Sequence, residues 1–212
     1  MYRPNGWLAH NWRTLCRPAG TQGAASNDKT FAAGGTKRTD REALGRSRGG
    51  LSTKIHVAAD SRCRPVARVT TAGQRHDSLA FEAVMANVCI HRPSGRRPRT
   101  RPSGVLADKA YATRKIRVSL RGKGIRATIP EPANQIAGRA AKGSKGGRPP
   151  DFDAELYKQR NTVERAINKL RGTRAVATRY DKRDFIYKGT IDVATIRIWL
   201  RDPVTHHSRD TA

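Results

Sequence analysis

The stretch YKQRNTVERAINKLR, from Tyr157 to Arg171, carries the pattern around which the chain is organised. Advanced as a helix at about 100° per residue, it gathers apolar residues into one stripe, within roughly 60°, that can be buried. A second stripe, within roughly 80°, carries one carboxylate framed by two arginines, an amide and a phenol. The apolar stripe consists of Leu156, Val163, Ile167 and Leu170, and the polar stripe of Tyr157, Arg160, Glu164, Asn168 and Arg171.

The polar stripe has two interpretations. Glu164 and Arg160 stand four residues apart, so they can form a surface ion pair that adds only about 0.3 kcal/mol to helix stability. Alternatively, the carboxylate takes part in chemistry, and the arginines and the phenol surround its ligand. The helix alone favours the ion pair, so the rest of the chain has to decide between the two.

Charge indicates the class of partner. The 212 residues include 43 Lys and Arg against 17 acids, a formal charge of +26. This length indicates one domain. Such an excess of positive charge repels itself in the compact state, so a polyanionic partner is expected, with nucleic acid as the first candidate. A membrane surface is less favoured, because no basic amphipathic helix dominates the sequence.

The cysteines and the apolar runs indicate the compartment. Cys16, Cys63 and Cys89 are odd in number and show no C-x-x-C spacing, which favours a reduced, cytosolic chain without a disulfide framework or zinc site. No apolar run is long enough to span a bilayer, and the N-terminus lacks the apolar core of a signal peptide. We therefore expect a cytoplasmic, nucleoid-associated protein with no membrane segment.

Residues 1–50 contain no Val and no Ile, and Gly, Ala, Arg, Thr and Asn dominate them. Strands favour β-branched and aromatic residues, so a central strand is not expected here. The cluster Trp7, Leu8, Trp12 and Leu15 favours a short helix instead. The prediction for residues 1–43 is an irregular basic arm.

The pattern changes at Leu51. The stretches LSTKIHVAAD (51–60) and PVARVTTA (65–72) alternate with a period of two and predict an antiparallel hairpin. An amphipathic helix is expected over SLAFEAVMANV (78–88), with Asp77 or Ser78 as its N-cap. Next, GVLAD (104–108), TRKIRVSLRGKG (113–124) and GIRATIP (124–130) predict a strand, a helix and a parallel strand.

Two basic segments interrupt these elements. Residues 91–103 form a loop punctuated by proline, and residues 134–150 are predicted to form a mobile, Gly-rich loop. GTRAVATRY (172–180) is expected to be extended, DFIYKGTIDVATIRIWL (184–200) helical, and residues 203–212 a disordered tail. The basic side chains expected to contact DNA are Arg96, Arg97, Arg99, Arg101, Lys142, Lys145 and Arg148.

Two carboxylates stand where chemistry can occur. Asp108 ends a strand predicted to be buried on both faces, and ligands of open α/β sheets collect at the carboxyl ends of strands. Glu164 lies on a helix in a basic neighbourhood. Carboxylate oxygens suit Mg²⁺ or Mn²⁺, and two-metal phosphoryl transfer needs several of them. The alternative for Asp108 is a cap on the following helix, and a cap is also favoured for His76 and Asp77 over a place in the same site.

The helix reads Tyr157-x-x-Arg160-x-x-x-Glu164, with Arg171 seven residues further on. This spacing resembles the Y-(2)-R-(3)-E-(6)-K signature of DDE transposases encoded by bacterial insertion sequences, with Arg171 where the family has Lys. Other segments are similar to the same family in the same order, so that the resemblance covers roughly residues 44 to 200. They are LGRSRGGLSTKIHVAAD (44–60), GVLADKAY (104–111), GIRATIPEP (124–132) and ATRYDK (177–182).

The resemblance implies an α/β, RNase H-like fold, a mixed sheet flanked by helices, over residues 44–202. It makes Asp108 the second and Glu164 the third catalytic acid, both holding Mg²⁺ or Mn²⁺. Tyr157 and Arg160 would contact or orient the DNA end, and Arg171 would contact a phosphate. The implied partners are double-stranded DNA, at transposon ends and target, and further copies of the chain in a homo-oligomer.

The family's first acid lies inside the first strand, upstream of Leu44. Asp28, in SNDKTFAAGG, is the nearest Asp-x-Thr but has Gly, Ala and Asn around it, and Asp60 falls in the hairpin turn. We therefore expect the first strand to be missing and the fold to be incomplete at the N-terminus. The implied function is a DNA transposase that cleaves and transfers strands at transposon ends, or a truncated, inactive copy. The alternative is a non-catalytic DNA-binding remnant.

Overall fold

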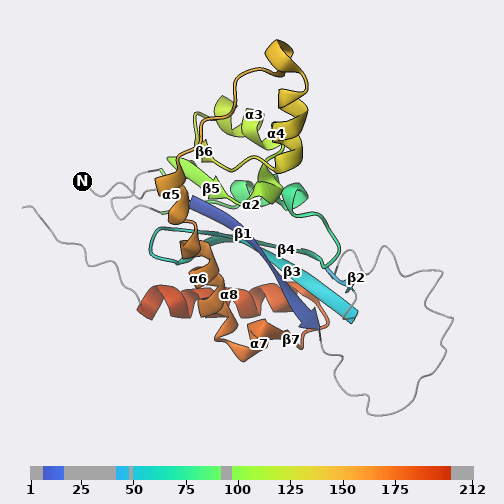
Figure 1. Ribbon diagram of the computed structural model, residues 1–212. Coiled ribbons are helices and arrows are strands. Elements are labelled where there is room, and N and C mark those ends of the chain that lie inside the picture. The colour runs from blue at the N-terminus through green and yellow to red at the C-terminus, as the bar shows by residue number, and fades with distance from the viewer. Residues whose placement is uncertain (1–6, 17–41, 48–49, 92–96, 202–212) are drawn as a thin grey trace, which may run out of the picture.

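The computed structural model describes residues 7–16, 42–47, 50–91 and 97–201 (Figure 1). These residues form one mixed β-sheet flanked by helices on both faces. The strands are β1 (Trp7–Cys16), β2 (Gly45–Ser47), β3 (Gly50–Ala59), β4 (Pro65–Ala72), β5 (Gly104–Ala107), β6 (Arg126–Thr128) and β7 (Thr178–Arg179). The α-helices are α2 (Phe81–Ala86), α3 (Arg114–Gly122), α4 (Ala133–Ala140), α5 (Ala154–Lys158), α6 (Asn161–Arg171), α7 (Arg174–Ala177) and α8 (Asp184–Arg201), and the 3-10 helices are η2 (Asp77–Ala80), η3 (Lys109–Tyr111) and η4 (Gly143–Gly146).

The sheet follows the order β2-β3-β1-β5-β6, with β4 paired to β3 and β7 paired to β1. The predicted hairpin is present, because β3 and β4 are antiparallel with Thr53 opposite Ala72. The predicted strand–helix–strand unit is also present, because β5 and β6 are parallel and α3 connects them. The mixed α/β fold predicted from the sequence is therefore confirmed.

Strand β1 was not predicted. It lies between β3 and β5, antiparallel to β3 with Trp12 opposite Ile55 and parallel to β5 with Ala9 opposite Ala107. The expectations of an irregular arm without a central strand, and of a sheet without its first strand, are wrong for these ten residues. Both neighbours offer backbone donors and acceptors to β1. The hydrogen bonds of two ladders therefore hold β1 in the sheet although it contains no Val or Ile.

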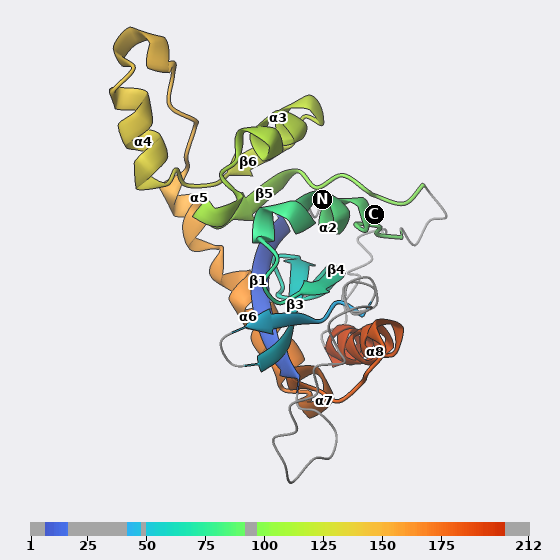
Figure 2. The same ribbon diagram turned by 90° about the vertical axis from the view of Figure 1, so that its right-hand side faces the viewer.

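Different helices cover the two faces of the sheet (Figure 2). On one face, α6 and α8 pack around a core that includes Ile55, Leu106 and Tyr187. On the other face, α2 and α3 pack against β5 through Val105 and Ala107. Successive β5 residues thus point to opposite cores, as expected for a strand buried on both sides.

The apolar stripe of the organising stretch is confirmed, but the helix is not continuous. Val163, Ile167 and Leu170 of α6 are buried, and Leu156 packs against the same core. However, α5 ends at Lys158 and α6 begins only at Asn161. The prediction of a single helix from Tyr157 to Arg171 is wrong.

Two segments predicted to be irregular contain helices. The basic segment 134–150 holds α4 and η4, because the alanine-rich sequence ANQIAGRA follows Pro132, which occupies the N-cap position of α4. The segment 172–180 holds α7, which begins after Thr173, before a two-residue strand β7. The predictions of a loop over 134–150 and of an extended segment over 172–180 are therefore wrong where these helices form.

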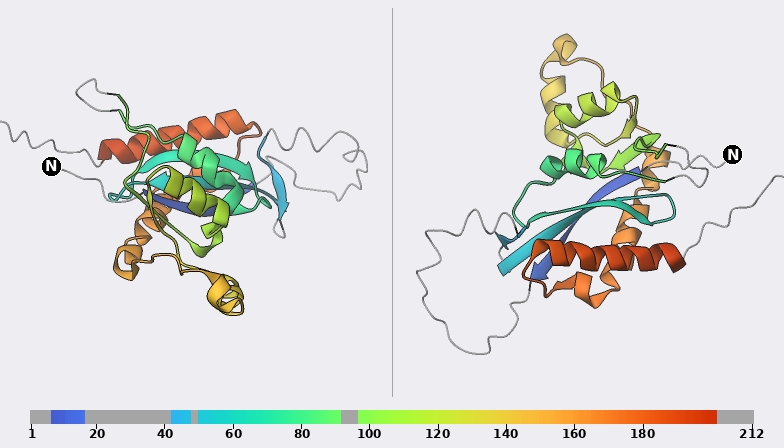
Figure 3. Two further views of the ribbon diagram at one scale, coloured as in Figure 1. Left: turned by 90° about the horizontal axis from the view of Figure 1, so that it is seen from above. Right: turned by 180° about the vertical axis from the view of Figure 1, so that it is seen from behind.

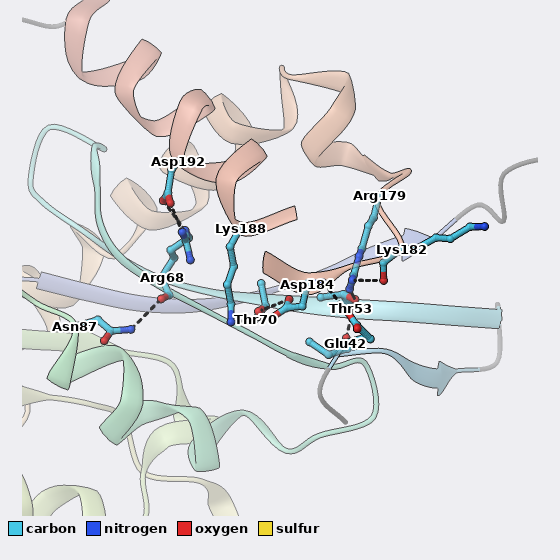
Figure 4. A network of polar contacts seen from close by, with 11 residues as sticks. Glu42, Thr53, Arg68, Thr70, Asn87, Arg179, Lys182, Asp184, Lys188 and Asp192 are labelled. Carbon is cyan, nitrogen blue, oxygen red and sulfur yellow. Dashed lines mark hydrogen bonds and ion pairs between the residues drawn. The ribbon is translucent and has the colours of Figure 1, made fainter. Parts of the chain in front are cut away.

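A polar network ties α8 to the sheet (Figure 4). Asp184 is buried at the start of the helix, where one carboxylate oxygen accepts a hydrogen bond from the Thr70 hydroxyl at 2.7 Å. Its other oxygen lies 2.6 Å from the ammonium of Lys188. The backbone N–H of Asp184 donates to Glu42 at 2.7 Å, and this bond, together with Arg183, lowers the pKa of the Glu42 carboxyl.

Across the part of the chain that the structure describes, no helix combines the length and the apolar character needed to cross a membrane. Two thiols in this part are free, Cys63 in the core and Cys89 at the surface.

Candidate functional site

Asp108 follows β5 directly and is half-buried. One of its carboxylate oxygens accepts a hydrogen bond from the backbone N–H of Lys109 at 2.7 Å, so that Asp108 caps η3. The capping role that the sequence offered as an alternative is therefore present. A carboxylate has two oxygens with several acceptor positions, so the cap leaves Asp108 able to bind a further ligand.

Glu164 lies in the first turn of α6. Its Oε1 is 2.9 Å from Nη2 of Arg160, and the two side chains are 42% and 25% exposed. The ion pair expected from the four-residue spacing is therefore present. At this exposure such a pair contributes between about 0 and 1 kcal/mol, so its main effect is to orient the carboxylate.

The phenol of Tyr157 is affected by the charges of both carboxylates. Burial raises the pKa of Tyr157, the positive charge of Arg160 lowers it, and the negative charges of Asp108 and Glu164 raise it further. The ring lies 5.6 Å from the Arg160 guanidinium and 5.3 Å from the ring of Phe152. The charges of an acid at a strand end and of an acid on a helix thus both act on Tyr157. Helix α5, which carries Tyr157, lies beside β5 and the start of β1 (Figures 1 and 2).

Asp60 does not join this site. It is buried in the turn between β3 and β4, where Oδ1 accepts from the backbone N–H groups of Arg62 and Arg64 at 3.0 and 2.9 Å. Its Oδ2 accepts from Nε of Arg64 at 2.8 Å. These bonds close the turn, so Asp60 has a structural role. Asp28, the other acid considered, lies outside the described residues.

His76 and Asp77 also have structural contacts. His76 is the N-cap of η2, because its Nδ1 accepts from the backbone N–H of Ser78 at 3.4 Å. The sequence placed this cap at Asp77 or Ser78, one or two residues later. Asp77 instead pairs with the ammonium of Lys54 at 2.7 Å.

Strand β1 passes the site without contributing an acid. Its pairing with β5 ends at Ala9, which is opposite Ala107, the residue before Asp108. The strand sequence WLAHNWRTLC contains no Asp or Glu. Within the described ranges, no three His, Cys, Asp or Glu side chains form a group that could hold a metal ion. Asp108 and Glu164 are carboxylates, the ligand type that Mg²⁺ prefers.

The predicted DNA contacts lie in separate parts of the molecule. Arg160 lies beside Tyr157, and Arg171 is exposed at the end of α6. Arg97 and Arg101 are exposed, and the half-buried Arg99 donates from Nε to the carbonyl of Arg101 at 2.9 Å. Arg96 lies outside the described residues.

The second basic segment forms a projection. Helices α4 and η4 extend away from the sheet (Figure 2), and Lys142, Lys145 and Arg148 are exposed along η4 and the segment after it. The segment 134–150, which was predicted to form a loop, is thus an ordered basic projection, called the α4 arm below. Arg139 on α4 also pairs with Glu131, which joins the helix to the chain at its base.

A basic groove that was not predicted from the sequence lies beside the α4 arm. Two clefts of 720 and 670 Å³ share Arg117, Arg121 and Arg148 as lining residues. Arg117 donates to the carbonyl of Ile129 at 2.8 Å, and burial lowers the pKa of its guanidinium. The signal was present in the sequence, because Arg114, Arg117 and Arg121 are spaced by three and four residues and so share one face of α3.

The mixed sheet, with one acid at the end of a strand beside β1 and another on a late helix, defines an RNase H-like fold. A family model described as a transposase DDE domain matches residues 23–196. A putative transposase for the insertion sequence element IS6501 of Brucella ovis is 26% identical over 151 residues, which are 71% of this chain and 100% of that relative. The chain therefore belongs to the DDE transposase family, and it is a DNA transposase domain of the insertion-sequence type.

Solved structures with lower similarity include the Mos1 strand transfer complex, with 11% identity over 92% of this chain and a TM-score of 0.37. The Mos1 mariner paired end complex with Mn shows 14% identity over 92% of this chain and a TM-score of 0.35. The intasome of simian T-cell lymphotropic virus, in complex with a PP2A regulatory subunit, shows 14% identity over 79% and a TM-score of 0.33. This chain spans 52%, 54% and 48% of those chains, about half of each.

Proposed function

We propose that this domain binds the DNA of transposon ends and cleaves a strand there in a metal-dependent reaction, before the freed end is transferred to target DNA. The observation that carries the proposal is the placement of Asp108 at the end of β5 and of Glu164 in the first turn of α6, with both negative charges raising the pKa of Tyr157. The two acids come from elements more than fifty residues apart, and both are accessible enough to meet a ligand.

Asp108 and Glu164 would hold the cation, Mg²⁺ or Mn²⁺, which supplies a Lewis acid that lowers the pKa of water and stabilises charge on a phosphate group. Arg160 holds Glu164 in place through their ion pair, and the N–H of Lys109 holds Asp108. Because the pKa of Tyr157 is raised, its phenol stays protonated and can donate a hydrogen bond to a phosphate oxygen.

Duplex DNA is the proposed partner of the basic surfaces. The groove lined by Arg117, Arg121 and Arg148 continues into the α4 arm, which carries Lys142 and Lys145. The segment 97–101 adds a second basic patch. Each phosphate neutralised there releases a counterion, so binding should weaken steeply with salt. The proposal places the protein in the cytoplasm, at the nucleoid, where its DNA partner is found.

DNA binding without cleavage is the second candidate function. It is favoured by β1, which pairs with β5 up to the residue before Asp108 and contains no carboxylate. With two acids in place of three, a cation would be held more weakly. The charge and the fold needed for DNA binding do not depend on that third acid.

The deciding experiment is nicking of supercoiled plasmid in the presence of Mn²⁺. We expect Asp108→Asn and Glu164→Gln each to abolish nicking, because each removes a charged oxygen ligand. Glu155→Gln is the matched control: it removes an acid from the adjacent helix α5 whose side chain is 80% exposed, and nicking should be unchanged.

Each variant is also tested for duplex binding over a range of salt concentrations. Nicking that survives in both Asp108→Asn and Glu164→Gln would show that another site or a contaminant cuts the DNA. If the wild-type chain binds duplex tightly and with strong salt dependence but does not nick it, the second candidate function is correct. Binding that is indifferent to salt would contradict both candidates.

A further inference from the structure

The basic groove is too narrow for a double helix. Its two clefts, of 720 and 670 Å³, share the face of α3 that carries Arg117 and Arg121. Clefts of about 300–1,000 Å³ enclose drug-sized ligands, and a nucleotide is of that size. A duplex, whose major groove alone is about 12 Å wide, is much larger than either cleft. A duplex can therefore rest on the rims of the groove, whereas a single strand can enter it.

Polar contacts hold the walls of the basic groove in place. On the side of the α4 arm, Nε2 of Gln135 donates to the carbonyl of Ala112 at 2.9 Å. On the opposite side, Nη2 of Arg126 lies 3.1 Å from Oδ2 of Asp153. Helix α3 and the α4 arm project from the same end of the sheet (Figure 3). The groove is therefore formed before any ligand arrives.

Basic side chains dominate the lining of the groove. The two clefts together are lined by seven Lys or Arg side chains and by two acids, Glu131 and Asp151. Glu131 is neutralised by its ion pair with Arg139. Arg121 and Arg148 are exposed, and neither has a carboxylate partner among the described residues. Their guanidinium groups are therefore available to phosphate oxygens.

The clefts also present apolar surface. Phe152, which is 42% exposed, lines the larger cleft together with Ile125 and Ala127. Val118, which is 57% exposed, lines the smaller one. Proteins that bind single-stranded nucleic acid combine a basic groove with aromatic side chains on which bases stack. In a duplex the faces of the bases are covered by their neighbours, so a ring inside a basic cleft suits an unpaired base.

Phe152 connects the groove to the candidate site. The centre of its ring lies 5.3 Å from the centre of the Tyr157 ring. The charges of Asp108 and Glu164 both act on that tyrosine. A strand that lies in the groove with a base on Phe152 therefore leads toward the two acids.

We propose that the basic groove holds one unpaired strand of DNA, with a base stacked on Phe152 and phosphates on the arginines of α3, while paired DNA lies along the α4 arm. This inference rests on the proposed function, which makes DNA the partner. It narrows the substrate of the groove to a DNA end whose strands have separated. A single strand releases fewer counterions per phosphate than a duplex. A preference for an unpaired end would therefore reflect the shape of the groove and stacking, and not its charge.

The test compares the affinity of the full-length chain for two DNAs that have the same number of phosphates. One is a blunt duplex, and the other is a fork in which about six terminal base pairs are mismatched, a length within the range of single-strand sites. Fluorescence anisotropy is measured in the presence of a chelator, so that no DNA is cleaved. The fork should bind about 10-fold more tightly, which is the effect of about one stacked base. Equal affinity for the two DNAs would overturn the proposal.

Variants of Phe152 test the stacking. Phe152→Ala should remove most of the preference for the fork and leave the affinity for the blunt duplex unchanged, whereas Phe152→Tyr should keep the preference. Phe185→Ala is the matched control, because Phe185 is 71% exposed on α8. Lys145→Ala changes η4 outside both clefts and should weaken binding of the two DNAs by the same factor. A preference that Phe152→Ala leaves intact, in a variant that circular dichroism shows to be folded, would contradict the proposal.

The fork experiment and the nicking experiment can fail separately. A chain that prefers the fork but does not nick plasmid supports the single-strand groove and removes the cleavage proposal. A chain that nicks through Asp108 and Glu164 but binds both DNAs equally removes the single-strand groove alone. Tighter binding of single-stranded RNA than of the fork would make RNA the occupant and would also overturn the inference.

Discussion

Two pairs of acidic residues in this molecule differ in burial and in the number of hydrogen-bond partners. Asp60 and Asp184 are only 7% and 6% exposed, and their carboxylate oxygens are bound by neighbouring side chains and backbone N–H groups. Asp108 is half-buried, and the Glu164 side chain is 42% exposed. The first pair lies where the chain must close a turn or anchor a helix. The second lies at element ends that a ligand can reach. Burial with complete pairing thus marks Asp60 and Asp184 as structural acids, whereas Asp108 and Glu164 are the acids for which we propose a functional role.

The largest expected effect is on stability, from Asp60→Ala. Arg64 is 5% exposed and would remain buried without its carboxylate, so we expect a loss of about 3–5 kcal/mol of unfolding free energy. Urea denaturation followed by circular dichroism measures this loss. In the double variant Asp60→Asn with Arg64→Met, most of the stability should return, because no charge is left buried and the asparagine amide oxygen can still accept from the two backbone N–H groups of the turn. Methionine can also pack on the Trp199 ring, which lies 4.0 Å from the Arg64 guanidinium. A single-variant loss below about 1 kcal/mol would place Asp60 with the exposed acids instead.

The second effect concerns pH and His56, which is 1% exposed on β3. Burial lowers the pKa of His56 from 6.5 to about 4, opposed by the charge of Asp77 and reinforced by Lys54 and Arg75. Between these two pKa values the unfolded chain binds a proton that the folded chain does not. Stability should therefore fall as pH falls through this window, by about 3 kcal/mol in total.

Unfolding free energies measured over the same pH range test this contribution. His56→Gln removes the titrating group, and its amide can still form a hydrogen bond with Thr71, the present partner of the His56 Nε2 at 2.8 Å. Its pH profile should be flatter than that of the wild-type chain. Parallel profiles for the two proteins would show that His56 does not control the window.

A smaller effect is expected from Arg121→Ala in the basic groove. The residue is exposed, so stability should change by less than about 0.5 kcal/mol. Loss of one phosphate contact should reduce the slope of log affinity against log salt by about 1. Arg201→Ala, an exposed arginine at the end of α8, is the control and should leave the slope unchanged. Equal slopes in both variants would remove the groove from the DNA path.

The smallest stability effect is expected from Glu164→Gln, less than about 1 kcal/mol, because its partner Arg160 and the Glu164 side chain itself are both solvated. DNA binding should stay close to the wild-type value, because the carboxylate faces the cation and not the phosphates. Thermal melting and duplex titration measure the two quantities. Unfolding of this variant would mean that Glu164, like Asp60, is a structural acid.

Local patterns made much of this fold predictable. The period of two in LSTKIHVAAD, the continuous apolar run before Asp108 and the buried stripe of α6 each depend on residues close in sequence. The cap at Asp108 and the ion pair of Glu164 with Arg160 are also local, so sequence spacing predicted both contacts. The helical stripe placed Glu164 on the same face as Tyr157, but the pairing of Asp108 with Glu164 in one site followed only from the family resemblance, because no local pattern joins a strand end to a helix fifty residues later.

The sequence by itself determined the charge, the hairpin, the parallel strand pair, the two acids and the family signature, because these depend on composition and on short spacings. Tertiary structure alone decided that WLAHNWRTLC is a strand, since its ladders come from β3 and β5 and its own sequence shows no apolar alternation with a period of two. It also decided that three arginines of α3 face a groove and that one side of α8 remains uncovered. In each case the partner surface is distant in sequence, and periodicity shows which residues share a face but not what covers that face.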